Sequence, residues 1–273
     1  MIKSKQLIIA CSLLFGMLLG LNVQAIVIRH DKGFVKYQAE EANYPAVFFL
    51  ERQRQRKVCV ATLIHPQWAI TAAHCVAETS LGETLASGRN FEVQVGGQPR
   101  HIDKIVIHPN YIPASAEEVD LALLHFETTS SQPLPLIINR RTDELNQVVT
   151  LLGWGFFGIG TTGRQYDDAQ FRRAQNRITV AHRRLHIKFD NPTKAGDEAL
   201  ELEGVPGLGD SGGPALFETS GVTTVVGVAV GELKYKDYND EFQGRYGAVI
   251  VYERLTRHWG WIQTVISSKQ QES

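Results

Sequence analysis

The sequence predicts an all-β fold that ends in a single helix. Short apolar runs typical of strands recur through most of the chain, and clusters of Gly, Pro, Asn and Asp separate them. The predicted strands are Ala46–Leu50, Val58–Ile64, Phe91–Val95, Lys104–Ile107, Leu121–Phe126, Val148–Leu152, Arg177–Ala181, Arg184–Phe189, Val225–Val230 and Tyr246–Val251. Only the segment from Glu253 to Ser267 repeats its large apolar residues at helical spacing. Thr128 to Arg141, with its two prolines, is typical of a connector between two halves of similar size.

The first 25 residues have the features of an export signal. Lys3 and Lys5 precede an apolar run from Leu7 to Leu21, and Val23-Gln24-Ala25 is a small-residue cleavage site. The run is shorter than the ~20 apolar residues that a membrane span requires. We therefore expect cleavage after Ala25, no stable membrane anchor, and a secreted or periplasmic protein.

Composition and charge limit the classes of partner. The chain of 273 residues has a formal net charge of −1 and 43% hydrophobic residues, which gives an ordinary core and no basic excess for nucleic acid. Basic residues cluster in 52–57 and in 172–184, where interleaved glutamines and strand-like spacing indicate solvated faces. The Gly153-x-Gly155-x-x-Gly158 string matches a dinucleotide fingerprint, but another loop follows it instead of a helix. We expect a monomer with no cofactor, no metal and no nucleic-acid partner.

Two cysteines, Cys59 and Cys75, remain after the predicted cleavage. In an exported protein such a pair most simply forms one disulfide, and two buried free thiols are the alternative. Closing a loop of this size would contribute about 3 kcal/mol through the unfolded state.

Three short motifs contain the residue types of a nucleophilic site. His74 lies in Thr71-Ala72-Ala73-His74-Cys75, where small neighbours leave the imidazole accessible for proton transfer near neutral pH. Asp120 directly precedes an apolar strand, where a carboxylate must be paired, and orienting a histidine is one such role. Ser211 lies in Gly209-Asp210-Ser211-Gly212-Gly213-Pro214, whose glycines favour tight turns and accessible amides. A satisfied core histidine and a turn aspartate are the structural alternatives for the first two.

Together these motifs resemble the active-site segments of chymotrypsin/trypsin-like serine proteases, as in a secreted member of bacterial type. The order His74, Asp120, Ser211 is that of the family, and Cys59 stands where the family's disulfide to the cysteine after the histidine begins. The flanking segments that are similar are His108-Pro109-Asn110-Tyr111, Gly153-Trp154-Gly155 and Trp259-Gly260-Trp261-Ile262. The resemblance covers Ile26 to about Ile266.

The resemblance implies two packed six-stranded antiparallel Greek-key β-barrels with a C-terminal helix. After the signal peptide, residues 1–25, residues 26–138 would form the barrel with His74 and Asp120. Residues 139–273 would form the barrel with Ser211, together with the terminal helix.

The implied activity is that of an exported serine endopeptidase. Ser211 would attack the carbonyl, His74 would take and return the proton, and Asp120 would orient the imidazolium. The amides of Gly209 and Ser211 would form the oxyanion hole, worth about 3 kcal/mol per donor. The alternative is a catalytically impaired protease-fold binding protein, because the expected substrate wall is unusual.

The resemblance also implies a set of substrate-binding residues. Val205 would lie at the base of the primary specificity pocket, in place of the aspartate that gives trypsins their Arg/Lys preference. An apolar floor disfavours a buried guanidinium. Val230 and Gly231 would form a wall beside an extended substrate, and Glu232 would attract basic side chains if it pointed inward. We expect a preference for uncharged or apolar side chains.

The resemblance also implies a way of activation for a chain that begins at Ile26. Members of the family become active when a cleaved Ile-Val terminus pairs its ammonium with the aspartate before the serine. Here the pair would be Ile26 and Asp210, and cleavage after Ala25 alone would produce the active form. The segment Ile28-Arg29-His30-Asp31 departs from the family's flexible Gly-Gly. The alternative is that Ile26-Val27 is only the first strand.

Overall fold

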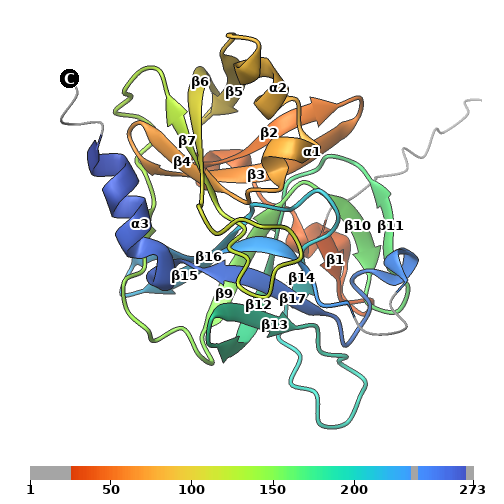
Figure 1. Cartoon of the computed structure of the whole chain (residues 1–273). Helices are drawn as coiled ribbons and strands as arrows, with labels where there is room; N and C mark the ends of the chain where they lie inside the picture. The colour runs from red at the N-terminus through yellow and green to blue at the C-terminus, as the bar shows by residue number, and fades with distance from the viewer. Residues whose placement is uncertain (1–25, 235–238, 269–273) are drawn as a thin grey trace, which may run out of the picture.

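Six antiparallel strands form the first barrel in the computed structural model, which describes residues 26–234 and 239–268 (Figure 1). The strands are β2 (Val47–Gln53), β3 (Arg56–His65), β4 (Trp68–Thr71), β5 (Phe91–Val95), β6 (Gln98–Ile107) and β7 (Ala122–Phe126). They pair in the order β2-β3-β4-β7-β6-β5, and the outer strands β2 and β5 lie against each other. The barrel is therefore nearly closed. Along β5, buried apolar residues alternate with exposed polar ones, as a sheet with one solvated face requires.

The second barrel is closed. Its strands are β9 (Val148–Gly153), β12 (Arg172–Ala181), β13 (Arg184–Lys188), β15 (Pro214–Thr219), β16 (Val222–Glu232) and β17 (Val249–Arg254). They pair in the order β15-β9-β12-β13-β17-β16, and β15 also pairs with β16, which removes the free edges of this sheet. The short strand β8 (Ile137–Ile138) adds to β16 in parallel.

A small third sheet contains the start of the described chain. Its strands are β1 (Ile26–Ile28), β10 (Phe156–Ile159), β11 (Gly163–Asp167) and β14 (Gly204–Val205), in the order β11-β10-β1-β14. All three residues of β1 are buried. Both β1 and β8, which the sequence places in the N-terminal half, thus pair with strands from the other half.

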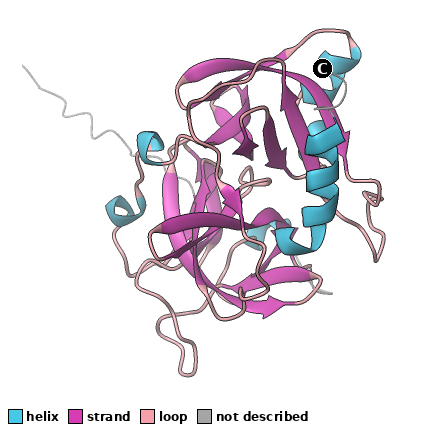
Figure 2. Cartoon of the chain, turned by 90° about the vertical axis from the view of Figure 1, so that its left-hand side faces the viewer, coloured by secondary structure: helices cyan, strands magenta, loops and turns pink. Residues whose placement is uncertain are grey.

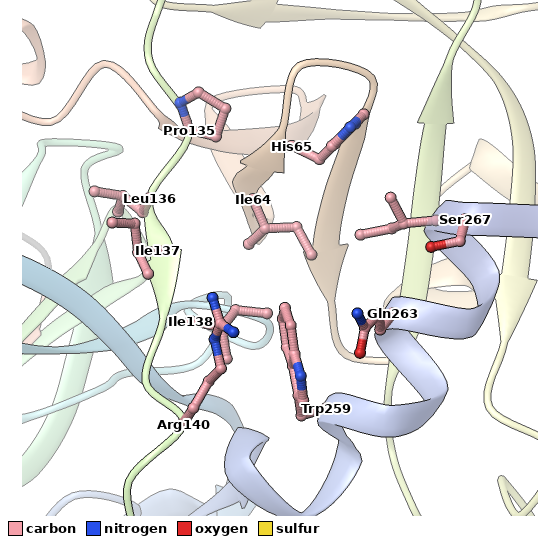
Figure 3. Close-up of a pocket in the computed structure, with 11 residues that line it drawn as sticks. Ile64, His65, Pro135, Leu136, Ile137, Ile138, Arg140, Trp259, Gln263 and Ser267 are labelled. Carbon is pink, nitrogen blue, oxygen red and sulfur yellow. The ribbon is translucent and has the colours of Figure 1, made fainter. Parts of the chain in front are cut away.

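The long helix α3 (Leu255–Ser268) runs along the side of both barrels (Figures 1 and 2). Its apolar residues join the core of the first barrel, where Leu255 and Ile262 are fully buried. A groove of about 310 Å³ remains where Trp259 and Gln263 face Ile64 of β3 and the segment before β8 (Figure 3). The shorter helices are α1 (Cys75–Glu78), α2 (Leu81–Ala86) and the 3₁₀ turns η1 (Phe34–Tyr37), η2 (Glu41–Asn43) and η3 (Asp240–Phe242). Over 26–234 and 239–268, no helix has both the length and the apolar character of a membrane span.

The predicted all-β fold with two six-stranded barrels and a terminal helix is confirmed. The helix begins at Leu255 instead of Glu253, because Glu253 and Arg254 belong to β17. Among the barrel strands, sequence patterns missed β4, which has four residues, and β15, which begins at Pro214 directly after the glycine-rich serine motif. Outside the two six-stranded sets they missed β8, β10, β11 and β14. The predicted signal peptide lies outside the described residues.

The interpretation of the basic clusters as solvated faces is wrong for two residues. The Arg172 side chain is 0% exposed and binds Asp168 through Nη1 (3.2 Å) and Nη2 (2.8 Å). Lys57 is also buried, and its Nζ lies 2.8 Å from Glu41 Oε1. Each buried cation has a carboxylate partner, as the cost of burying a charge requires.

Candidate active site

His74 lies in the tight turn between β4 and α1. The turn is fixed to β3, because Thr71 Oγ1 donates a hydrogen bond to Val60 O at 2.7 Å. The two alanines before His74 are buried, and His74 itself is partly exposed. The small neighbours therefore leave the imidazole accessible, as the sequence predicts.

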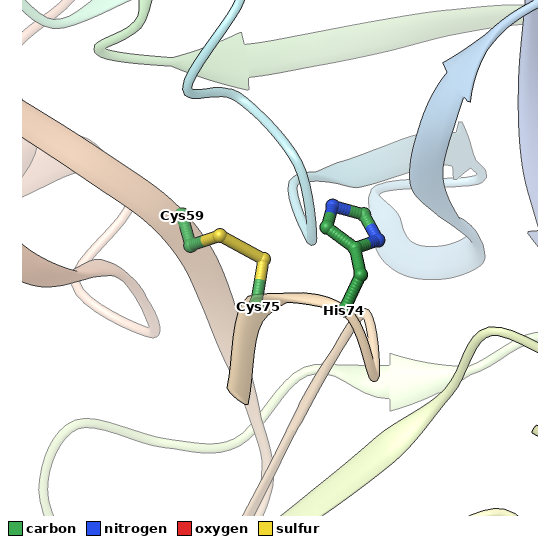
Figure 4. A group of neighbouring side chains, drawn as sticks. All are labelled: Cys59, His74 and Cys75. Carbon is green, nitrogen blue, oxygen red and sulfur yellow. A yellow bond between two sulfur atoms is a disulfide. The ribbon is translucent and has the colours of Figure 1, made fainter. Parts of the chain in front are cut away.

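The predicted disulfide between Cys59 and Cys75 is present, with a Cα–Cα distance of 5.9 Å. It joins β3 to α1 beside His74 (Figure 4). One atom from each of Cys59, His74 and Cys75 lies within 4.8 Å of the others. Since both sulfurs are bonded to each other, they are not the thiolates that a metal ion requires. The cluster is a covalent anchor for the histidine turn.

Asp120 holds His74 through two hydrogen bonds. Asp120 Oδ2 lies 2.6 Å from His74 Nδ1, and Oδ1 accepts from the His74 backbone N–H at 2.9 Å. A proton on Nδ1 facing the carboxylate leaves Nε2 free to accept another proton. Burial lowers the pKa of His74, but the hydrogen bond and charge of Asp120, with the charges of Glu78 and Glu118, outweigh it and raise the pKa above its ordinary value.

Ser211 lies on a loop of the second half that is bound to β3 of the first. Cys59 N donates to Gly209 O at 3.0 Å, and Val60 N donates to Ser211 O at 2.7 Å. Cys75 Sγ lies 3.5 Å from the same Ser211 carbonyl oxygen. The disulfide therefore contacts both the histidine turn and the serine loop. Across the described residues, no hydrogen bond joins Ser211 Oγ to His74.

The backbone of the serine loop leaves two amides available. Asp210 N donates to Gly207 O (3.1 Å) and Gly212 N donates to Ala229 O (2.8 Å), but the amides of Gly209 and Ser211 have no acceptor among the described residues. These are the two predicted oxyanion-hole donors. Gly212 has φ +81°, and a Cβ there would lie 2.1 Å from Val60 O, so only glycine fits between the loop and β3.

Asp210 is enclosed by the second barrel and the segment after β9. The residue is 1% exposed, and its carboxylate accepts from Gly155 N at 2.6 Å and Gly207 N at 2.9 Å. A Cβ at Gly153 would lie 1.9 Å from Asp210 Oδ1. The Gly153-x-Gly155 string therefore accommodates a carboxylate. Burial raises the pKa of Asp210 to about 7, although backbone N–H groups oppose this.

The strand β1 lies next to the two segments that bind Asp210. Ile26 is in register with Phe157 of β10, and Val27 is in register with Val205 of β14. Within the described part of the chain, no hydrogen bond or ion pair joins Ile26 to Asp210. The departure from Gly-Gly has a structural role, since Arg29 binds Asp31 through Nε (2.9 Å) and Nη2 (2.6 Å). The activation pair therefore stays a prediction.

The predicted substrate-binding residues differ in exposure. Val205 is 0% exposed, whereas Gly231 is exposed, and a Cβ on it would meet nothing within 4 Å. Val230 is half-buried at an irregularity in the β16–β17 pairing. The carboxylate of Glu232 accepts from Gly244 N at 2.9 Å, and burial raises its pKa to about 7. Their roles toward substrate stay predictions.

Comparison with known sequences agrees with this geometry. The sequence model of the family described as Trypsin matches residues 34–254. The chain belongs to the trypsin-like serine protease family. In this family the substrates are polypeptides.

Three curated relatives show the extent of the similarity. Human granzyme M is 29% identical over 163 residues, 58% of this chain and 63% of the granzyme. Rabbit vitamin K-dependent protein C is 27% identical over 239 residues, 80% of this chain and 48% of protein C. Mouse ovochymase-2 is 32% identical over 132 residues, 45% of this chain and 22% of the ovochymase. The chain thus spans less than two thirds of the length of each of these relatives.

Proposed function

We propose that this trypsin-family chain is an exported serine endopeptidase of bacterial type that acts as a monomer through an acyl-enzyme. The observation that carries the proposal is the doubly hydrogen-bonded pair of His74 and Asp120, beside a disulfide whose Cys75 Sγ lies 3.5 Å from the carbonyl oxygen of Ser211. A buried carboxylate on Nδ1 gives the histidine the tautomer that a general base needs.

The proposed reaction has two halves. Ser211 Oγ attacks the carbonyl carbon while His74 Nε2 takes its proton, and the amides of Gly209 and Ser211 stabilise the oxyanion. The intermediate collapses as His74 protonates the leaving amine, which leaves an acyl ester on Ser211. Water then attacks the ester, with His74 as base, and releases the acid and the free serine.

Activation by cleavage after Ala25 is part of the proposal. Asp210 is buried, and its hydrogen-bond partners among the described residues are neutral amides. An ammonium on Ile26 would supply the missing positive charge from the adjacent strand β1. Since a leader peptidase would perform this cleavage during export, we also propose a secreted or periplasmic location.

We propose a primary specificity for uncharged or apolar side chains. The support is Val205, which the family resemblance assigns to the base of the pocket and which is apolar and fully buried. A charge would be needed at that position to bind Arg or Lys. The Glu232 carboxylate is hydrogen-bonded to Gly244 and does not replace that charge.

The experiment is labelling of the protein that begins at Ile26 with a fluorophosphonate, with Ser211→Ala as the matched control. We expect covalent modification at Ser211 only, and turnover of ester and peptide substrates. A folded protein with the Ile26 terminus that binds peptides but shows no serine-dependent labelling would instead be the binding protein. This second candidate, a protease-fold binding protein, is tested because no hydrogen bond joins Ser211 to His74 in the described structure.

A further inference from the structure

A buried ion pair in the second barrel contacts the backbone of the first barrel at Asp120. Glu253 of β17 is 0% exposed, and its Oε1 accepts from the Asp120 backbone N–H at 3.0 Å. The same oxygen accepts from Arg184 Nε of β13 at 2.7 Å. Neither residue stands out in the sequence, where Glu253 is assigned to the terminal helix and Arg184 to a solvated face.

The residues just before Asp120 are held by arginines of the second barrel. Arg184 Nη2 and Arg183 Nη1 each donate to the Glu118 carbonyl oxygen at 2.8 Å. The carbonyl of residue 118 is thus bound by guanidinium groups and the amide of residue 120 by a carboxylate. The backbone immediately before the Asp120 side chain therefore takes its position from the second barrel.

The Asp120 carboxylate depends on this backbone for its orientation. Among the described residues its two oxygens accept hydrogen bonds only from His74. Because no further donor fixes the carboxylate, a shift of the 118–120 backbone would move the carboxylate and the imidazole together.

The charges around Glu253 keep it ionised. Burial would raise its pKa, but His258, the Asp120 amide and Arg184 outweigh burial and lower the pKa below its ordinary value. His258 Nε2 lies 3.6 Å from Glu253 Oε2, beyond hydrogen-bond distance. His108 lies behind His258, with ring centroids 5.2 Å apart. Among the described residues, Arg184 and His258 are thus basic groups beside Glu253, with Arg183 next to Arg184 on the Glu118 carbonyl and His108 next to His258.

We propose that Glu253 and Arg184 are a positioning pair that fixes Asp120, and through it the imidazole of His74, from the barrel that carries Ser211. This inference rests on the proposed function, because the position of the imidazole matters for a serine nucleophile. Ser211 and the carboxylate that orients His74 would then both be positioned by the second barrel. Small movements between the two barrels would therefore change the distance between nucleophile and base little.

The test compares three folded variants. Glu253→Gln keeps an oxygen that can accept from Asp120 N–H and loses the charge opposite Arg184, while Glu253→Ala removes both. The matched control is Glu144→Gln, because Glu144 is also 0% exposed and also binds an arginine, with Arg254 Nε at 3.0 Å and Nη2 at 2.6 Å. In the described chain the Glu144 side chain makes its hydrogen bonds to Arg254 and Thr256, and none to Asp120.

The measurements are kcat and KM on a small ester, with active sites counted by fluorophosphonate, and the pKa of His74 by NMR. We expect kcat to fall about 100-fold in Glu253→Ala and about 10-fold in Glu253→Gln, with KM nearly unchanged, as misplacement of a reacting group predicts. The pKa of His74 should fall in both. Glu144→Gln should lower the melting temperature while leaving kcat and the His74 pKa at wild-type values.

The positioning role is overturned if Glu253→Gln and Glu144→Gln behave alike in kcat and in the pKa of His74. If the wild type does not label but the Glu253 variants lower the His74 pKa, the proposed function fails and the positioning role stands. If Glu253→Ala does not fold, the same measurements on Glu253→Gln and Arg184→Lys test the positioning role. Arg184→Lys is informative because Lys keeps the positive charge but lacks the forked donors of Arg.

Discussion

The two halves of the candidate site are held by different kinds of contact. On the first barrel, His74 donates two hydrogen bonds to a carboxylate, and the neighbouring disulfide fixes its turn. On the second, the Ser211 loop surrounds the buried carboxylate of Asp210, which is bound by neutral amides. The first half therefore has the hydrogen-bond partner of its histidine in place, and the second encloses a carboxyl group with a pKa of about 7 and no cation bound to it among the described residues.

The contrast suggests different requirements for the two halves of the candidate site. A histidine bound to a buried aspartate needs nothing further to act as a base. A buried carboxyl at the base of a glycine-rich loop responds to any cation brought beside it, because burial penalises its charged form. The serine half is thus the place where processing of the chain would act.

Removing the charge of the first half should have the largest effect. Asp120→Asn would place an amide opposite His74 Nδ1 and favour the wrong tautomer, so we expect kcat to fall about 10⁴-fold. The measurement is ester hydrolysis at pH 8 with active sites counted by labelling. Asp143→Asn is the control, since Asp143 is a partly exposed partner of Arg141. A loss below tenfold would show that the two halves do not differ as described.

Changing the terminus should affect only the second half. Protein that begins at Ile26 should react with a fluorophosphonate about 100-fold faster than protein with one extra residue before Ile26, because an incomplete oxyanion hole costs about that much. Asp210→Asn should abolish the difference while His74 keeps its NMR pKa. Equal rates for both termini would remove Asp210 from the activation scheme.

Crowding Asp210 should disturb the serine half directly. In Gly153→Ala, the new Cβ would lie 1.9 Å from Asp210 Oδ1, so the carboxylate or β9 must move. We expect a loss of activity of about tenfold or more and destabilisation of about 2 kcal/mol from overpacking. Gly33→Ala is the control, because a Cβ there meets nothing within 4 Å. Urea unfolding and labelling rates measure both effects, and wild-type behaviour of Gly153→Ala would contradict the described contact.

The smallest effect should be a change of pH dependence in the first half. Glu118 is one of the charges that raise the pKa of His74. The base is active when neutral, so kcat/KM rises as pH increases through that pKa, and Glu118→Gln should move the acid limb to lower pH. The exposed neighbour Glu117 contributes no such charge, and Glu117→Gln should leave the limb in place. Identical profiles for the two variants would refute the assignment.

The sequence was sufficient for features that depend on short strings of residues. The motifs around His74, Asp120 and Ser211, the pairing of Cys59 with Cys75, and most strands of the barrels follow from local patterns. The role of Glu253 does not, because its partner Asp120 lies 133 positions away and nothing in the local pattern indicates the contact. The prediction that Arg172 lies on a solvated face is wrong for a similar reason. Its burial depends on the surrounding barrel and on its partner Asp168, which the local pattern does not indicate.

The strand β1 has a consequence for the order of events during synthesis. Its partners, Phe156–Ile159 and Gly204–Val205, are made long after residues 26–28. Strand β1 therefore has no partner until β9 and β10 have been made, and its pairing with β14 must wait until β12 and β13 of the second barrel have been made as well. Such distant pairings form late. If cleavage after Ala25 occurs as proposed, the released terminus would have to wait for these partners, so the order of the chain would set the earliest moment at which the proposed activation could occur.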